Sequence, residues 1–128
     1  MRTLRCILYF EKDIDVRSET IFTLSEKGGL DVLSYDCLDD AIDFGDQINP
    51  DLVLLNAEMD GFSVEEILGK LRKFDQMATI PAVLLTTRPV PDNYLENNSY
   101  GVVDVLSKHI SGKDLLIKLH EIWGQLSE

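Results

Sequence analysis

The chain has 128 residues, of which 45% are hydrophobic and 27% are charged. Domains commonly hold about 100 to 150 residues, so we expect residues 1–128 to form a single domain. The 12 basic and 23 acidic side chains give a formal net charge of −11. This acidic balance argues against a nucleic acid partner, because binding to a phosphate backbone needs a basic face. No uncharged apolar stretch is long enough to cross a membrane, so we expect no membrane partner.

The N-terminus lacks the zones of a secretory signal peptide. Met1 to Leu4 lead directly into a strand-like segment, without separate basic, apolar and small-residue zones. We therefore expect a cytoplasmic protein. In that compartment Cys6 and Cys37 stay reduced, and we expect both to be core thiols that lie too far apart for a disulfide.

Five short segments rich in β-forming apolar residues predict strands. They cover residues 6–10, 32–35, 51–55, 80–86 and 102–106. The run CILYF is apolar throughout, and DLVLL is apolar after its first residue. Such runs are typical of parallel strands that are covered on both faces.

The first two connections carry helical patterns. The first helix is expected from about residue 14 to residue 27, with Asp13 or Asp15 as its N-cap. Gly28 and Gly29 follow as a stop signal. A modest acidic helix is expected near residues 39–47.

The later connections differ sharply from one another. Ser63 and Glu66 form the spacing of a capping box, which predicts a helix from that point. Ser111 opens a last helix, whose apolar face extends to Leu126. The stretch 88–100 predicts only a short or distorted helix. Its poor helix formers are Pro89, Pro91, Asn93, Asn97 and Asn98.

This alternation of strands and helices predicts a doubly wound α/β fold, with a five-stranded parallel sheet and helices on both faces. In such sheets ligands bind beyond the carboxyl ends of the strands. The side chains that follow the strands are therefore candidate site residues. They are Glu11, Lys12, Asp13, Asn56, Thr86, Thr87, Ser107 and Lys108.

Four stretches of the chain carry a family pattern, and together they cover nearly its whole length. They read ILYFEKDIDVR, PDLVLLNAEMDGFSVEEILGKLR, IPAVLLTTR and GVVDVLSKHISGKDLL. In these stretches the sequence resembles the receiver domain of bacterial two-component response regulators. The resemblance implies a CheY-like, flavodoxin-like sheet with strand order 2-1-3-4-5, and a role in phosphorelay signal transduction.

Receiver domains of this family move a phosphoryl group from a histidine kinase onto an aspartate after the third strand. Mg²⁺ is held there by that aspartate and by an acidic pair after the first strand. The resemblance puts Asn56 at the acceptor position and Glu11 and Lys12 at the acidic pair. An amide cannot form an acyl phosphate, and Mg²⁺ prefers oxygen ligands. We therefore expect weak or absent Mg²⁺ binding and no cofactor.

Other family positions are partly retained. The resemblance matches Thr86 to the hydroxyl residue that contacts the phosphoryl group, and Lys108 to the family lysine. Val105 stands where the family has a mobile aromatic residue, and its β-branched side chain is stiff. His109 follows Lys108 where proline is common, so we expect a trans peptide bond there.

Two interpretations of Lys12 stay open. It either replaces the metal cation by holding Glu11 and the Asn56 amide, or it is a solvated lysine at a loop tip. We expect Lys108 to pair with Glu11, and the Thr86 hydroxyl to serve a structural role.

The leading functional interpretation is a pseudo-receiver: a phosphorylation-independent protein-interaction module that is not an enzyme. Its expected partner is another signalling protein, such as a histidine kinase or an output protein, and the chain is expected to be a monomer or a weak homodimer. Tyr94, Leu95 and Tyr100 form a candidate partner surface, because exposed aromatic area often marks interaction sites.

Two alternatives remain. One is a divergent receiver that is still phosphorylated, at Asp60 or another nearby carboxylate. The other is a flavodoxin-like small-ligand binder, which the acidic loop 11–15 disfavours because it repels phosphate. The sequence leaves open whether the chain acts alone or is part of a larger regulator.

Overall fold

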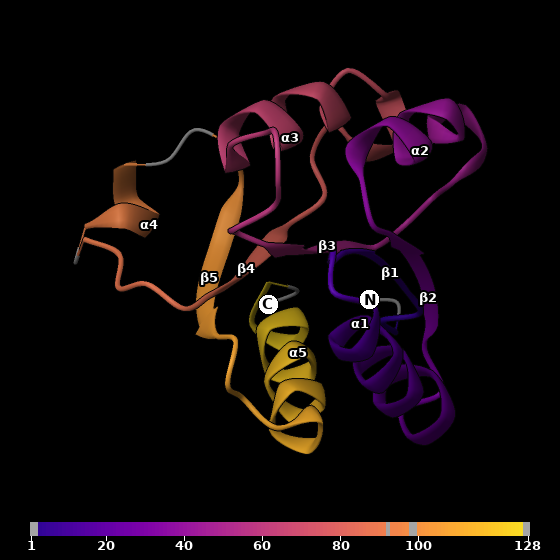
Figure 1. Cartoon of the computed structure of the whole chain (residues 1–128), viewed down its shortest axis with the longest axis vertical. Helices are drawn as coiled ribbons and strands as arrows, with labels where there is room; N and C mark the ends of the chain where they lie inside the picture. Colours follow the sequence, from indigo (N-terminus) through magenta and orange to yellow (C-terminus); the bar gives the residue numbers. More distant parts are fainter. Residues whose placement is uncertain (1–2, 92, 98–99, 127–128) are drawn as a thin grey trace.

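The computed structural model describes residues 3–91, 93–97 and 100–126. Met1, Arg2 and Asn98, which entered the sequence argument, lie outside the described residues. The strands are β1 (Cys6–Phe10), β2 (Asp31–Tyr35), β3 (Leu52–Asn56), β4 (Ala82–Thr86) and β5 (Val102–Ser107). They pair in parallel in the order β2-β1-β3-β4-β5 (Figure 1). The predicted α/β fold and its strand order are thus confirmed.

Helices cover both faces of the sheet. In Figure 1, α1 and α5 lie on one side of the strands, and α2 and α3 lie on the other. The α-helices are α1 (Ile14–Ile21), α2 (Leu38–Asp43), α3 (Val64–Leu71), α4 (Tyr94–Asn97) and α5 (Gly112–Leu126). Three further helical segments are the π-helix η1 (Phe22–Lys27) and the 3₁₀ helices η2 (Gly45–Gln47) and η3 (Asp75–Met77).

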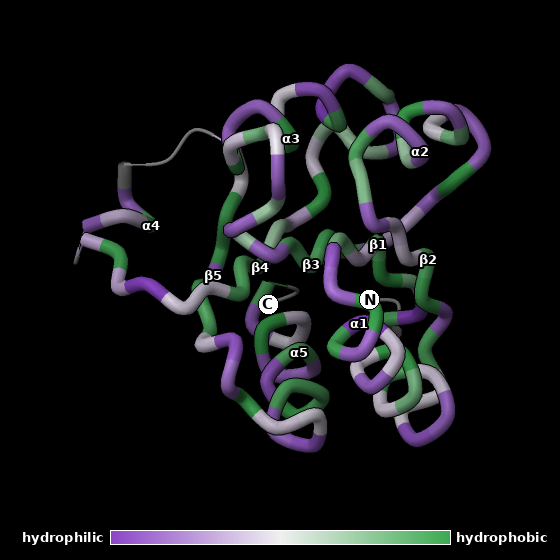
Figure 2. The backbone as a smooth tube through the Cα atoms, viewed as in Figure 1, coloured by the Kyte–Doolittle hydropathy of each residue, from purple (hydrophilic) through white to green (hydrophobic). Residues whose placement is uncertain are grey.

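Two hydrophobic cores fill the space between the sheet and its two helical layers. Successive strand residues point to opposite faces. Leu8 and Phe10 therefore join the core under α2 and α3, while Ile7 and Tyr9 join the core under α1 and α5. The tube in Figure 2 is accordingly hydrophobic along the central strands. The cores hold the sheet rigid, so the strand ends are fixed relative to one another.

The helix starts follow the predicted local chemistry. Asp13 caps α1, since its carboxylate accepts hydrogen bonds from the backbone N–H groups of Asp15 and Val16. Ser63 and Glu66 form the predicted capping box of α3, with both reciprocal hydrogen bonds at 3.1 Å. The helical segment that begins at α1 ends before Gly29, whose φ of +68° suits glycine. That segment finishes as the π-helix η1, which the sequence pattern did not predict.

The connection between β4 and β5 contains the short helix that the sequence predicted. Of the residues that the structure describes in this connection, Tyr94–Asn97 form an α-helix of four residues. The far end of this connection is tied to α3 by Arg72, which donates to the backbone oxygens of Met77 at 2.8 Å and Tyr100 at 2.6 Å. Gly101 follows with φ of +79°, and a Cβ at that position would lie 2.7 Å from the Arg72 guanidinium. The positive φ favours glycine at this position, and a larger residue would also have to displace the Arg72 guanidinium.

Side-chain burial differs from the sequence-based prediction at Cys6, Cys37 and Leu126. Cys6 and Cys37 are free, as predicted, but neither is a core thiol, because Cys6 is half-buried and Cys37 is exposed. The exposure of Cys37 follows from its position. It lies in the loop that leads into α2, and loops run over the protein surface. Leu126 is also exposed, at 47%, because α5 ends there and its buried face is completed by Ile122. Among the described residues, no helix combines the length and the apolarity that a membrane span needs.

Candidate functional site

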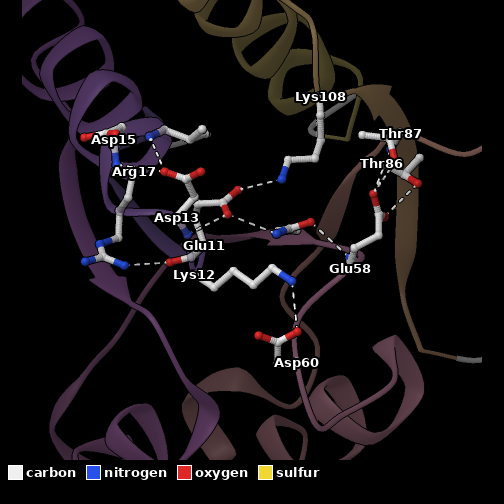
Figure 3. Close-up of polar contacts among 12 residues, drawn as sticks. Glu11, Lys12, Asp13, Asp15, Arg17, Glu58, Asp60, Thr86, Thr87 and Lys108 are labelled. Atoms are coloured by element: carbon white, nitrogen blue, oxygen red, sulfur yellow. Dashed lines mark hydrogen bonds and ion pairs between the residues drawn. The ribbon is translucent and has the colours of Figure 1, made fainter.

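The carboxyl ends of β1, β3, β4 and β5 bring most of the predicted site residues together (Figure 3). Glu11 lies at the centre and is fully buried. Its Oε1 atom is 3.2 Å from the Nζ atom of Lys108. Its Oε2 atom accepts hydrogen bonds from the Asn56 side-chain amide and from the Asp13 backbone, each at 3.1 Å. The predicted pair between Lys108 and Glu11 is therefore present.

Asn56 is also fully buried, and both ends of its amide are bound within the chain. The Nδ2 atom donates to Glu11, while the Oδ1 atom accepts the backbone N–H of Glu58 at 3.0 Å. A carboxylate oxygen of Glu11 can only accept and an N–H can only donate, so this orientation of the amide satisfies both neighbours. Residue 56 thus acts as a neutral bridge between β1 and the loop after β3.

Glu58 extends this network to the end of β4. Its Oε2 atom accepts the Thr86 hydroxyl at 2.9 Å. Its Oε1 atom accepts the Thr87 backbone N–H at 2.9 Å and the Thr87 hydroxyl at 2.8 Å. Partial burial acts to raise the pKa of the Glu58 carboxyl, but these hydrogen bonds and the charge of Lys108 together lower it. The charged form of Glu58 is therefore favoured.

The structural role predicted for Thr86 is consistent with these contacts. Its hydroxyl oxygen accepts the backbone N–H of Arg88 at 3.0 Å, so the side chain links Glu58 to the start of the next loop. Thr87 was among the strand-end residues that the sequence predicted, whereas Glu58 was missing from the sequence-based site. The sequence contains a signal for this contact. Glu58 lies two residues after the end of β3, Thr86 and Thr87 lie at the end of β4, and these two strands are neighbours in the sheet.

Lys12 points away from the buried network. It pairs with Asp60 at 2.9 Å, and their side chains are 42% and 86% exposed. The interpretation in which Lys12 holds Glu11 and the Asn56 amide is therefore wrong. Consecutive residues at a strand end point in opposite directions, so the inward position of Glu11 turns Lys12 outward.

The positions around α4 are less uniform than the sequence argument assumed. Leu95 is 43% exposed, whereas Tyr94 and Tyr100 are half-buried and pack against the core under α3. Val105 is also half-buried against that core. A groove beside α4 and β5 is lined by Val90, Pro91, Tyr94, Leu95, Asp104 and Val105.

No cis peptide bond occurs among the described residues, so the bond after Lys108 is trans as predicted. One group of potential metal ligands lies elsewhere in the described part of the chain. The ligand atoms of Asp36, Cys37 and Asp40 lie within 4.8 Å of one another, near the end of β2. Surface acidic groups of this kind are common without an ion.

Comparison with known proteins gives a consistent family assignment. A model of the response regulator receiver domain matches residues 7–120. The phosphate regulon transcriptional regulatory protein PhoB of Escherichia coli is 27% identical over 123 residues, which cover 96% of this chain and 53% of that protein. The probable transcriptional regulator ycf29 of Cyanophora paradoxa is 28% identical over 111 residues, with 87% and 52% covered. The chain thus spans about half the length of these curated relatives.

Solved structures share the same fold. The chemotaxis protein CheY4 of Vibrio cholerae aligns with a TM-score of 0.82 and 21% identity, covering 94% of this chain and 99% of that one. A CheY-like response regulator receiver domain protein of Methanospirillum hungatei aligns with a TM-score of 0.79 and 20% identity, covering 98% of each chain. At this identity the similarity concerns the fold alone.

Proposed function

Since the chain belongs to the response regulator receiver domain family, we propose that it is an atypical receiver of two-component signal transduction that works through protein contacts alone. In this proposal residue 56 takes no phosphoryl group. The observation that carries the proposal is the Asn56 amide, whose nitrogen binds Glu11 and whose oxygen binds the Glu58 N–H. An amide provides no carboxylate oxygen for an acyl phosphate, and both the nitrogen and the oxygen of this amide are bound within the protein.

The same pocket is a poor match for Mg²⁺. This ion binds through one or two carboxylates in tight octahedral geometry. Of the residues at the matching positions, Glu11 alone is a carboxylate, and its oxygens face Lys108, Asn56 and Asp13. A metal ion would have to displace the Lys108 ammonium from Glu11. Breaking this buried ion pair is unfavourable and therefore opposes metal binding. We therefore propose that Mg²⁺ binds weakly or not at all, and that the chain has no catalytic activity of its own.

Receiver domains interact with kinases or output domains, and we propose a partner of that kind. Val90 precedes α4 and Leu95 lies within it. These apolar side chains are 37% and 43% exposed and line a groove, which supports a contact surface there. The curated relatives are transcriptional regulators of about twice this length. An output region of the same or another chain is therefore a candidate partner.

The direct test is incubation with a small-molecule phosphodonor and Mg²⁺, followed by intact-protein mass spectrometry. We expect no stoichiometric gain of a phosphoryl group. A stoichiometric gain would overturn the proposal. If that gain disappears in Asp60→Asn, the chain is a phosphorylated receiver with a shifted acceptor, because Asp60 is the exposed carboxylate four residues past β3.

A further inference from the structure

The carboxylate of Glu58 accepts three hydrogen bonds from other residues of the chain. Both of its oxygen atoms accept hydrogen bonds, and all three donors come from Thr86 and Thr87 at the end of β4 (Figure 3). The three distances lie between 2.8 and 2.9 Å. Hydrogen bonds to an ionised acceptor are short and about twice as strong as neutral ones. This carboxylate is therefore held firmly in one place.

The donors around Glu58 are of the kind that bind a small oxyanion. One backbone N–H and two hydroxyl groups converge on the carboxylate, and the Lys108 ammonium adds favourable charge from β5. Such a combination of N–H, O–H and cationic donors suits any compact group with several acceptor oxygens. The site is thus complete on the protein side, and its occupant is a side chain of the same protein.

We propose that Glu58 is the built-in ligand of an oxyanion site formed by Thr86 and Thr87 beside Lys108, so that the chain fills its own anion site. This inference rests on the proposed function, because it assumes that no phosphoryl group enters the pocket from Asn56. The occupant is covalently tethered, so the site is filled without a free ligand and is independent of ligand concentration.

Filling the site also fixes the beginning of the connection to α4. A hydroxyl group has one hydrogen, which Thr86 directs to Glu58 over the shorter of its two acceptor distances, 2.9 Å against 3.3 Å to the Arg88 carbonyl. The Thr86 oxygen then accepts the Arg88 N–H. The occupied anion site therefore holds Thr86 and the following backbone in a single arrangement.

The test compares Glu58→Ala and Glu58→Gln with the wild-type chain and with the control Glu65→Ala. Glu65 is an exposed carboxylate that lines the same surface groove, and it shares the charge of Glu58 without the contacts to Thr86 and Thr87. Amide hydrogen exchange, measured by NMR, should be about tenfold faster at Thr87 in Glu58→Ala, because a hydrogen bond to a charged group is lost. The control should leave that amide unchanged.

Inorganic phosphate is the probe of the anion site itself. Potassium phosphate, compared with potassium chloride at equal ionic strength, should shift the Thr87 and Arg88 amide resonances in Glu58→Ala and Glu58→Gln. It should leave them unshifted in the wild type and in Glu65→Ala. An equal response in all four proteins, no response in any, or unchanged Thr87 exchange in Glu58→Ala would overturn the proposal.

Glu58→Gln keeps the side-chain volume, so the phosphate response remains measurable if the alanine variant does not fold. Inorganic phosphate is not a phosphodonor. The phosphate titration can therefore contradict the anion site while mass spectrometry supports the proposed function. Mass spectrometry can equally contradict the proposed function while the titration supports the anion site.

Discussion

Replacing Asn56 with aspartate would place two carboxylates against each other in the buried network. The Nδ2 atom of Asn56 donates to the Oε2 atom of Glu11 at 3.1 Å, and a carboxylate at position 56 has no hydrogen to donate. Two like charges at that separation repel by about 5 kcal/mol at an effective dielectric constant of ~20. The folded state of the variant is therefore strained by its own charges.

Proton uptake limits this penalty. Protonating a carboxyl group of ordinary pKa near ~4 at about pH 7 costs about 4 kcal/mol, at 1.36 kcal/mol per pKa unit. The nearby Lys108 ammonium offsets a further part of the repulsion. We therefore expect Asn56→Asp to lower the free energy of unfolding at neutral pH by about 2 to 4 kcal/mol.

The assay is urea denaturation of Asn56→Asp over a range of pH, with Asn49→Asp as the control for adding a charge at an exposed position. In the variant the shared carboxyl pair has a raised pKa when folded. The loss of stability is therefore full above that raised pKa and is relieved as the pH falls through it. The double variant Glu11→Gln with Asn56→Asp exchanges the amide and the carboxylate, and should recover much of the lost stability. A stability of Asn56→Asp that equals the wild type at every pH would refute this reasoning.

Three further predictions follow from single contacts. Lys108→Met should destabilise the fold by about 3 to 5 kcal/mol in urea denaturation, because it leaves the Glu11 charge buried without its cation; a loss below about 1 kcal/mol would contradict a buried pair. Lys12→Ala should change the same quantity by less than about 1 kcal/mol, since its pair with Asp60 is exposed, and a larger loss would show that Lys12 supports the pocket. Burial raises the pKa of Tyr9 from 10.0 to about 12, so the unfolded chain releases the Tyr9 proton first and the free energy of unfolding falls as the pH rises above 10. In urea denaturation at alkaline pH, Tyr9→Phe should show a shallower fall than the wild type. An identical fall in the two proteins would disprove the raised pKa of Tyr9.

The sequence predicted the features that depend on neighbouring residues. The capping box at Ser63 and Glu66 and the stop at Gly29 require only local hydrogen bonds and backbone preferences, so their spacing is visible in the chain. Asn56 and Lys108 were found because parallel strands deliver their carboxyl ends to one edge.

Other features depend on directions and reach that a linear pattern does not specify. The sequence does not specify which of the neighbours Glu11 and Lys12 faces the pocket, and the structure turns Lys12 outward to Asp60. The contact of Glu58 with Thr87 joins the ends of two different strands. Such contacts are set by the tertiary arrangement. The π-helix η1 is also absent from the sequence pattern, which predicts one continuous helix from residue 14 to residue 27.

The connection from β4 to β5 is anchored at both ends by side chains that belong to neither strand. Glu58 binds Thr86 and Thr87 where it leaves the sheet, and Arg72 binds the Tyr100 carbonyl where it returns. Neither anchor involves α4. Leu95 and Glu96 are exposed within α4. Substitutions at these two positions can therefore change the surface that this crossover presents while the pairing of the two strands is preserved.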